Sequence, residues 1–133
     1  MATITLSPIS QRSQIIQAVR SGEIEPNYIL SVSSDPKTVK SLIDGILTGV
    51  MYGMPANGSG EWNDCPFASL GCEMACLNTS GHGGIGLDQD NLNPVQIARL
   101  KRSAYFHTRR SEFWTMLIRD IDALIRKAKK LGL

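Results

Sequence analysis

The sequence has few of the residues that would place it in a specialised class of protein. It holds only three cysteines, all within residues 65–76, so a framework of paired disulfides is excluded. No run approaches the ~20 consecutive apolar residues of a membrane span. The N-terminus has no basic region followed by an apolar segment, so we expect no secretion and a reducing, cytoplasmic location. The apolar fraction of 42% and the charged fraction of 20% are those of an ordinary globular protein, which argues against disorder.

The length of 133 residues suffices for one domain with a core but not for two. We therefore predict a single domain, 1–133, with three parts. Residues 1–50 form a helix–strand–helix unit, residues 51–93 a metal-binding loop, and residues 94–133 a basic helical hairpin.

The first part contains two helical patterns and one strand pattern. Apolar spacing predicts a helix over 10–20, stopped by Gly22, and a short strand over 27–33. Pro36 opens a second helix that we expect to reach residue 47, with Asp35 as its cap. We expect one face of it to pack inward, through Val39, Leu42, Ile43, Ile46, Leu47 and Val50.

The last part contains two further helices. Asn93 as cap and Pro94 as first residue predict a helix over 94–107. Ser111 is expected to cap the strongest helix, which Gly132 ends. Its broad apolar stripe consists of Trp114, Leu117, Ile118, Ile121, Leu124, Ile125, Ala128 and Leu131. The predicted fold class is thus α/β and helix-rich, with about four helices and a short strand around a long loop.

The loop between these parts carries the cysteines. Cys65, Cys72 and Cys76 put three soft thiolate ligands within reach of one centre, and a structureless loop of this length needs such an organiser. Residues 70–77 are expected to form one helical turn that places Cys72 and Cys76 on one face. Three buried structural thiols are less favoured, because the segment is polar and rich in glycine.

The crowded spacing favours an iron–sulfur cluster, [4Fe–4S], over zinc. Cysteines in one loop can each hold one iron, whereas zinc modules usually place their ligands in two separate pairs. His82 is the first candidate for a fourth ligand. Gly83 and Gly84 would let the backbone approach the centre and its cofactor without a side chain in the way.

Charge is divided unevenly along the chain. Residues 61–93 carry acids only, whereas residues 94–133 carry ten basic residues against three acidic ones. Four cations near aromatic residues are candidate nucleic-acid contacts: Lys101, Arg102, Arg109 and Arg110. A solvated helix surface is the alternative interpretation, since no known nucleic-acid module matches.

The run Cys65-Pro66-Phe67-Ala68 with Cys72 and Cys76, followed by Ile97-Ala98-Arg99, Arg109-Arg110 and Phe113-Trp114, resembles a known family. This is the phage-encoded gene-product-eighty-eight-like family, some members of which are described as similar to rolling-circle replication initiators. The resemblance covers about residues 50 to 130. It implies a cysteine loop at the mouth of an incomplete barrel, similar in outline to radical S-adenosylmethionine enzymes, with Cys65, Cys72 and Cys76 as cluster ligands. It also implies a phage accessory protein in the cytoplasm of an infected host cell.

The expected function is therefore that of an iron–sulfur protein with redox, radical or Lewis-acid chemistry at the fourth iron. The alternative is a zinc-stabilised nucleic-acid-binding protein with a basic helical surface. The expected partner is a small molecule or an electron-transfer protein, and we expect self-association through apolar surface near the C-terminus. The residues leave open whether the protein is an enzyme.

Overall fold

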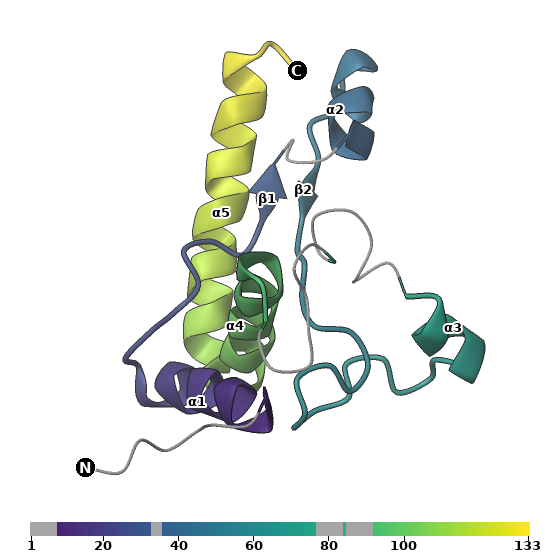
Figure 1. The fold of residues 1–133 in the computed structure, drawn as a ribbon. Coiled ribbons are helices and arrows are strands. Elements are labelled where there is room, and N and C mark those ends of the chain that lie inside the picture. The colour runs from purple at the N-terminus through teal and green to yellow at the C-terminus, as the bar shows by residue number, and fades with distance from the viewer. Residues whose placement is uncertain (1–7, 33–35, 77–83, 85–91) are drawn as a thin grey trace.

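Two helices that lie far apart in the sequence, α1 (Pro8–Ser21) and α4 (Pro94–Thr108), pack against each other in the lower part of Figure 1. Ile16 and Val19 of α1 are at most 1% exposed and share one buried cluster with Leu100 of α4. Each such side chain stabilises the fold by about 1.5–3 kcal/mol through burial. This helix pair forms the centre of the core. The computed structural model describes residues 8–32, 36–76, 84 and 92–133.

The other elements surround this pair. They are β1 (Ser31–Val32), α2 (Pro36–Ile43), β2 (Gly49–Val50), α3 (Leu70–Met74) and α5 (Arg110–Lys130). The two strands pair antiparallel and lie beside the upper half of α5, with α2 above them, whereas α3 stands apart at the lower right (Figure 1).

Five helices and two short antiparallel strands in the described residues confirm the prediction of a helix-rich α/β fold. Those residues close no barrel. None of the helices they form is long and apolar enough to cross a membrane.

Helix α4 begins where the sequence predicts. The side chain of Asn93 accepts a hydrogen bond from the Gln96 amide at 2.8 Å, and Pro94 is the first helical residue. A cap of this kind satisfies an amide that would otherwise lack a partner.

Helix α2 is shorter than predicted and ends at Ile43. Gly45 has a φ of +80°, which glycine adopts without steric cost. Its amide donates to the Leu42 carbonyl at 3.0 Å, and the Ile46 amide donates to the Ser41 carbonyl at 3.1 Å. These two bonds are the helix-ending pattern known as the Schellman motif.

The early end of α2 overturns the predicted inward face. Ile43 is 83% exposed and Ile46 57% exposed, and Val39 is also exposed. The strand predicted over 27–33 is likewise shorter in its described part, 27–32, where only Ser31 and Val32 pair with β2. Asp35, the predicted cap of α2, lies outside the described residues.

Helix α5 follows α4 after the single residue Arg109. Ser111 was predicted to cap α5, but it lies inside the helix, and the connecting position is occupied by Arg109 without a side-chain cap. The buried residues of α5 are Phe113 and Met116, neither of which belongs to the predicted apolar stripe.

Asp120 joins α5 to the chain entering β1. Its Oδ2 accepts hydrogen bonds from the backbone amides of Ile29 at 2.6 Å and Leu30 at 3.1 Å, and Arg119 binds its Oδ1 at 2.9 Å. Burial by itself would raise the pKa of Asp120, but the two amides and Arg119 together outweigh burial and lower it.

Replacing Asp120 with Asn should therefore destabilise the fold by about 1–3 kcal/mol at neutral pH, because hydrogen bonds to a charged acceptor are lost. A lowered pKa in the folded state gives stability that is present above the unfolded pKa, about 4, and that is lost as pH falls through the folded pKa. The difference between wild type and Asp120→Asn should thus shrink in acid. Urea unfolding from pH 7 to pH 3 measures it.

Asp122→Asn is the matched control, since Asp122 is exposed on the same helix and should change stability little. An equal loss in both variants, or a difference independent of pH, would contradict the role given to Asp120.

Candidate functional site

The cysteines follow a loop, residues 53–64, that is hydrogen-bonded to α4. We call it the anchored loop. The backbone amide of Met54 donates to Ser103 Oγ at 2.8 Å, and both residues are buried. A Cβ atom at Gly53 would lie 2.9 Å from the same oxygen. The chain can approach Ser103 this closely because residue 53 has no side chain.

The same loop is also held by α1. Arg12 Nε donates to the Gly58 carbonyl at 3.1 Å, and Arg20 pairs with Glu61 at 2.7 Å. The Arg20–Glu61 pair is exposed and therefore contributes little stability. Together the two arginines fix the loop on a second side.

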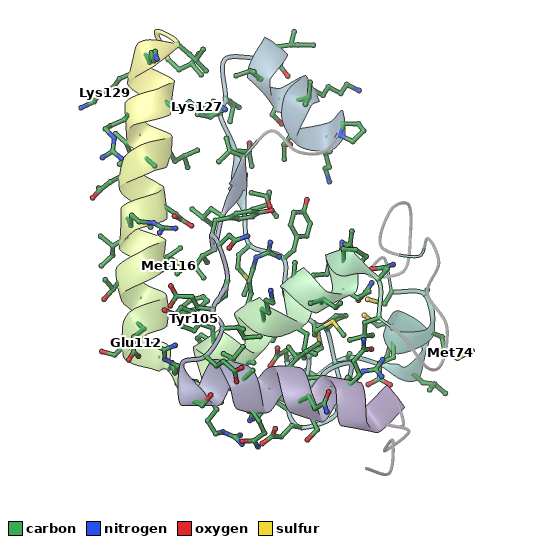
Figure 2. All side chains as sticks on the ribbon, turned by 60° about the vertical axis from the view of Figure 1, so that its left-hand side comes forward. Met74, Tyr105, Glu112, Met116, Lys127 and Lys129 are labelled. Atoms are coloured by element: carbon green, nitrogen blue, oxygen red, sulfur yellow. The ribbon has the colours of Figure 1, made fainter. Side chains whose placement is uncertain are left out.

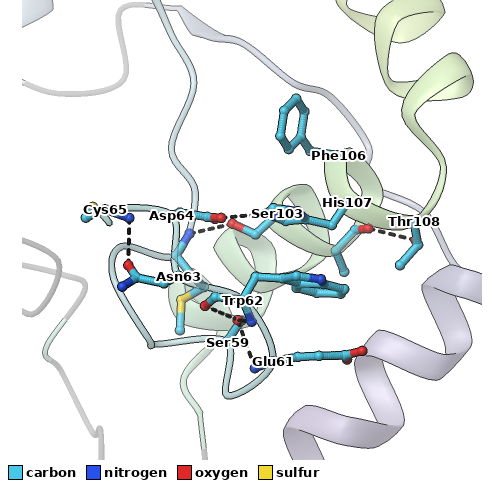
Figure 3. A network of polar contacts seen from close by, with 12 residues as sticks. Ser59, Glu61, Trp62, Asn63, Asp64, Cys65, Ser103, Phe106, His107 and Thr108 are labelled. Carbon is cyan, nitrogen blue, oxygen red and sulfur yellow. Dashed lines mark hydrogen bonds and ion pairs between the residues drawn. The ribbon is translucent and has the colours of Figure 1, made fainter. Parts of the chain in front are cut away.

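A serine turn stiffens the loop from within. Ser59 is 2% exposed, and its Oγ accepts hydrogen bonds from the amides of Glu61 at 3.2 Å and Trp62 at 3.0 Å (Figure 3). It also lies 3.1 Å from the Trp62 carbonyl, to which it donates. The direction of the chain is thereby set just before the first cysteine.

His107, in the last turn of α4, holds the end of the loop. Its Nε2 lies 2.5 Å from Asp64 Oδ1, and its ring stacks on Trp62 with centroids 4.6 Å apart and planes 7° from parallel (Figure 3). Phe106 packs its ring edge-on to the imidazole at 5.2 Å. A hydrogen-bond partner, Asp64, and a stacking partner, Trp62, therefore fix the imidazole of His107 between two parts of the chain.

Cys65 directly follows Asp64 in the chain, and its backbone is also held by a hydrogen bond. Its amide donates to Asn63 Oδ1 at 2.9 Å (Figure 3). Cys65 therefore directly follows a fixed part of the chain. We call this part the root, and it consists of Asn63, Asp64 and His107.

Beyond this root, residues 65–76 form the cysteine arm. Ser69 caps α3 by accepting a hydrogen bond from the Cys72 amide at 3.1 Å. Helix α3 has no buried residue, and Phe67 is 99% exposed. The arm projects from the body and has no core of its own.

All three thiols of the arm are free. Cys72 is exposed, and Cys65 and Cys76 are half-buried. The helical turn predicted over 70–77 is wrong at its end, because α3 stops at Met74 and leaves Cys76 outside the helix.

In the ranges that the structure describes, no group of three or more His, Cys, Asp or Glu side chains stands close enough to hold a metal ion. His82 and Gly83, the other predicted ligand and cofactor positions, lie outside those ranges, and Gly84 is described and half-buried. The donor set itself fits a soft metal centre, because it offers three unpaired thiols.

Arg102, one of the predicted nucleic-acid contacts, points into the fold. It is 5% exposed, donates to the carbonyls of Tyr28 at 3.2 Å and Tyr52 at 3.0 Å, and stacks over the Tyr28 ring. Burial lowers the pKa of its guanidinium, and Tyr28 opposes that shift. Arg102 ties α4 to the chain around the two strands.

The other three cations differ in their surroundings. Arg109 stacks over Tyr105 and lies 4.0 Å from Glu25 and 3.8 Å from Glu112. Arg110 is exposed and covers Phe106 at 4.2 Å, and Lys101 is half-buried. A nucleic-acid surface formed by these four cations stays a prediction, and Arg110 is the one among them that is exposed.

Sequence reasoning did not find Asp64 of the root, Trp62 that stacks on His107, or Ser103 that holds the loop 53–64. Asp64 and His107 are 43 residues apart in the chain, and their meeting depends on how α4 packs. The available signal was weak: one of only two histidines stands at a helix end, and an acid directly precedes the first cysteine.

His107→Ala should loosen the root while leaving the core intact. Losing the Asp64 contact and the Trp62 stack should cost about 1–2 kcal/mol and should speed hydrogen exchange of residues 59–65. Thr108→Ala is the control, because that hydroxyl bonds only the Ala104 carbonyl within α4. Unchanged exchange at residues 59–65 in His107→Ala would show that His107 does not hold the root.

Comparison with known proteins places the chain in a family. No curated protein and no solved structure gives a significant match. A family description, gene product 88, matches residues 29–133, and so begins earlier than the resemblance over residues 50 to 130 and includes β1, α2 and β2. The anchored loop, the cysteine arm, α4 and α5 all fall within the match, and the chain therefore belongs to the gene product 88 family.

Proposed function

We propose that the cysteine arm binds an iron–sulfur cluster through Cys65, Cys72 and Cys76. The observation that carries this proposal combines two features. The root is rigid, and the arm that follows it has three free thiols and a helix, α3, with no buried residue. Such an arm gains little from its own packing, and ligation of its thiols to a common centre would supply the missing order.

The donor set favours a four-iron cluster over zinc. Closely spaced thiolates of one loop each hold one iron, and three cysteines leave the fourth iron to another ligand. His82 is our candidate for that position. When bound, such a cluster supplies one-electron transfer and, at an iron open to solvent, a Lewis acid.

Residues of the chain would determine both the position of the first ligand, Cys65, and the charge around this centre. The His107–Asp64 contact and the Asn63 side chain fix the backbone at Cys65, so Cys72 and Cys76 would have to move toward Cys65 for the three thiols to hold one cluster. Residues 61–93 carry only acids, and negative charge near a cluster lowers its reduction potential.

Protein prepared without air should be brown and contain about four irons and four sulfides per chain. Each of the variants Cys65→Ser, Cys72→Ser and Cys76→Ser should lose most of the iron and the visible absorption. Met74→Leu is the matched control, because it removes an exposed sulfur from the same arm without removing a thiol. Metal and sulfide analysis with visible spectroscopy measures these outcomes.

Circular dichroism of the serine variants separates loss of the cluster from loss of the fold. A colourless wild type with one zinc per chain would contradict the cluster and favour the zinc-stabilised nucleic-acid-binding alternative. His82→Ala should change the spectrum of the bound cluster, and an unchanged spectrum would remove His82 as a ligand.

A further inference from the structure

Helix α5 exposes an apolar stripe along its length. Trp114 is 49% exposed, Ile118 59% and Ile121 40%, and Ile125 continues the row at 47%. The row advances by four, three and four residues, which is the heptad spacing that keeps one side of a helix facing a partner. The side of α5 that carries Phe113 and Met116 already faces the body. The exposed stripe is therefore a second apolar surface without a partner in the described residues.

The C-terminal part of α5 beside this stripe is positively charged. Four exposed cations lie there, and none makes an ion pair with a described residue: Arg126, Lys127, Lys129 and Lys130. A matching surface should be apolar at its centre and acidic beside it.

The cysteine arm has these properties. Phe67 is 99% exposed, Leu70 73% and Met74 79%, and Leu70 and Met74 are one helical turn apart. Glu73 is exposed between them, and the segment 61–93 contains no Lys or Arg. The arm is thus apolar, with one exposed carboxylate and no cation, where the end of α5 is apolar and basic.

One chain cannot bring these two surfaces together. The arm stands on the opposite side of the molecule from α5 (Figure 1), and a view turned by 60° again separates Met74 from Lys127 and Lys129 (Figure 2). The anchored root at Asp64 and His107 keeps the start of the arm on its own side.

We infer that the arm of one copy docks on the α5 stripe of a second copy. Phe67, Leu70 and Met74 cover the row from Ile118 to Ile125, and the Glu73 carboxylate lies near the basic end of α5. Stable interfaces bury about 1,600 Å² in total. Reciprocal exchange, in which each copy gives its arm and receives the other, doubles the contact and closes the assembly as a twofold dimer. This inference does not depend on what the cysteines bind.

Two variants separate this dimer from other modes of association, and both keep all three cysteines. The arm variant is Phe67→Asp with Leu70→Asp, and the stripe variant is Ile118→Asp with Ile121→Asp. Light scattering and sedimentation should show wild type as a dimer that weakens with salt. Each variant alone should be monomeric, with a dissociation constant raised at least ~30-fold.

The decisive sample is the mixture of the two variants. The arm variant keeps an intact stripe and the stripe variant keeps an intact arm, so the mixture should form a mixed dimer with one of the two contacts. Its affinity should lie between those of wild type and of the single variants. A tag on one variant, with sedimentation of the other, identifies the mixed species.

Other outcomes overturn the inference. A monomeric wild type excludes the dimer, and a dimer unaffected in the arm variant means that α5 pairs with α5. A mixture that stays monomeric while each variant unfolds like wild type on heating shows that arm and stripe do not meet. Ser111→Asp with Thr115→Asp, exposed polar positions of the same helix, serves as a control that adds the same two negative charges without loss of apolar side chains.

Discussion

Burial of one side of α4 against α1 is the interaction on which the rest of this structure depends. Leu100 and Ala104 are fully buried, and the cluster that they share with Ile16 and Val19 extends to Ile29, Met54 and Phe113. Because α4 is fixed by this apolar contact, its polar side chains can act as fastening points for three other segments. Arg102 holds the chain around the strands, Ser103 holds the anchored loop, and His107 holds the root of the cysteine arm.

These contacts explain how the described part of the chain, which has little regular sheet, holds its loops and chain segments in place. The strands contribute only two residues each, and backbone groups outside helices must find other partners. Asp120 satisfies two of them, Ser59 satisfies two more, and the Arg102 guanidinium takes two carbonyls. Side chains of this protein thus bind backbone groups that the neighbouring strands of a larger sheet would bind in other folds.

The helices near Pro8, Pro94 and Arg110 could be predicted because the apolar spacing within each is a local property of the sequence, and Asn93 and Pro94 also mark the start of α4. The length of α2 could not, since Gly45 reads equally as a tolerated interior glycine or as the residue that ends the helix. Ser111 is a good capping residue, but the chain turns two residues earlier, where stacking of Arg109 on Tyr105 and packing of Phe113 decide the junction. The cysteines were visible in the sequence. Their root was not, because Asp64 meets His107 only through the packing of α4.

The one-residue junction at Arg109 has a mechanical consequence. With no flexible linker, the direction of α5 is fixed by the last turn of α4, and that turn also carries His107. A helix of 21 residues is about 30 Å long at 1.5 Å per residue. A tilt of only about 5° at Arg109 therefore moves the far end of α5 by about 3 Å. The last turn of α4 therefore both holds the root of the cysteine arm and sets the direction of α5, and the contacts of Asp120 with the amides of Ile29 and Leu30 hold α5 in that direction further along its length.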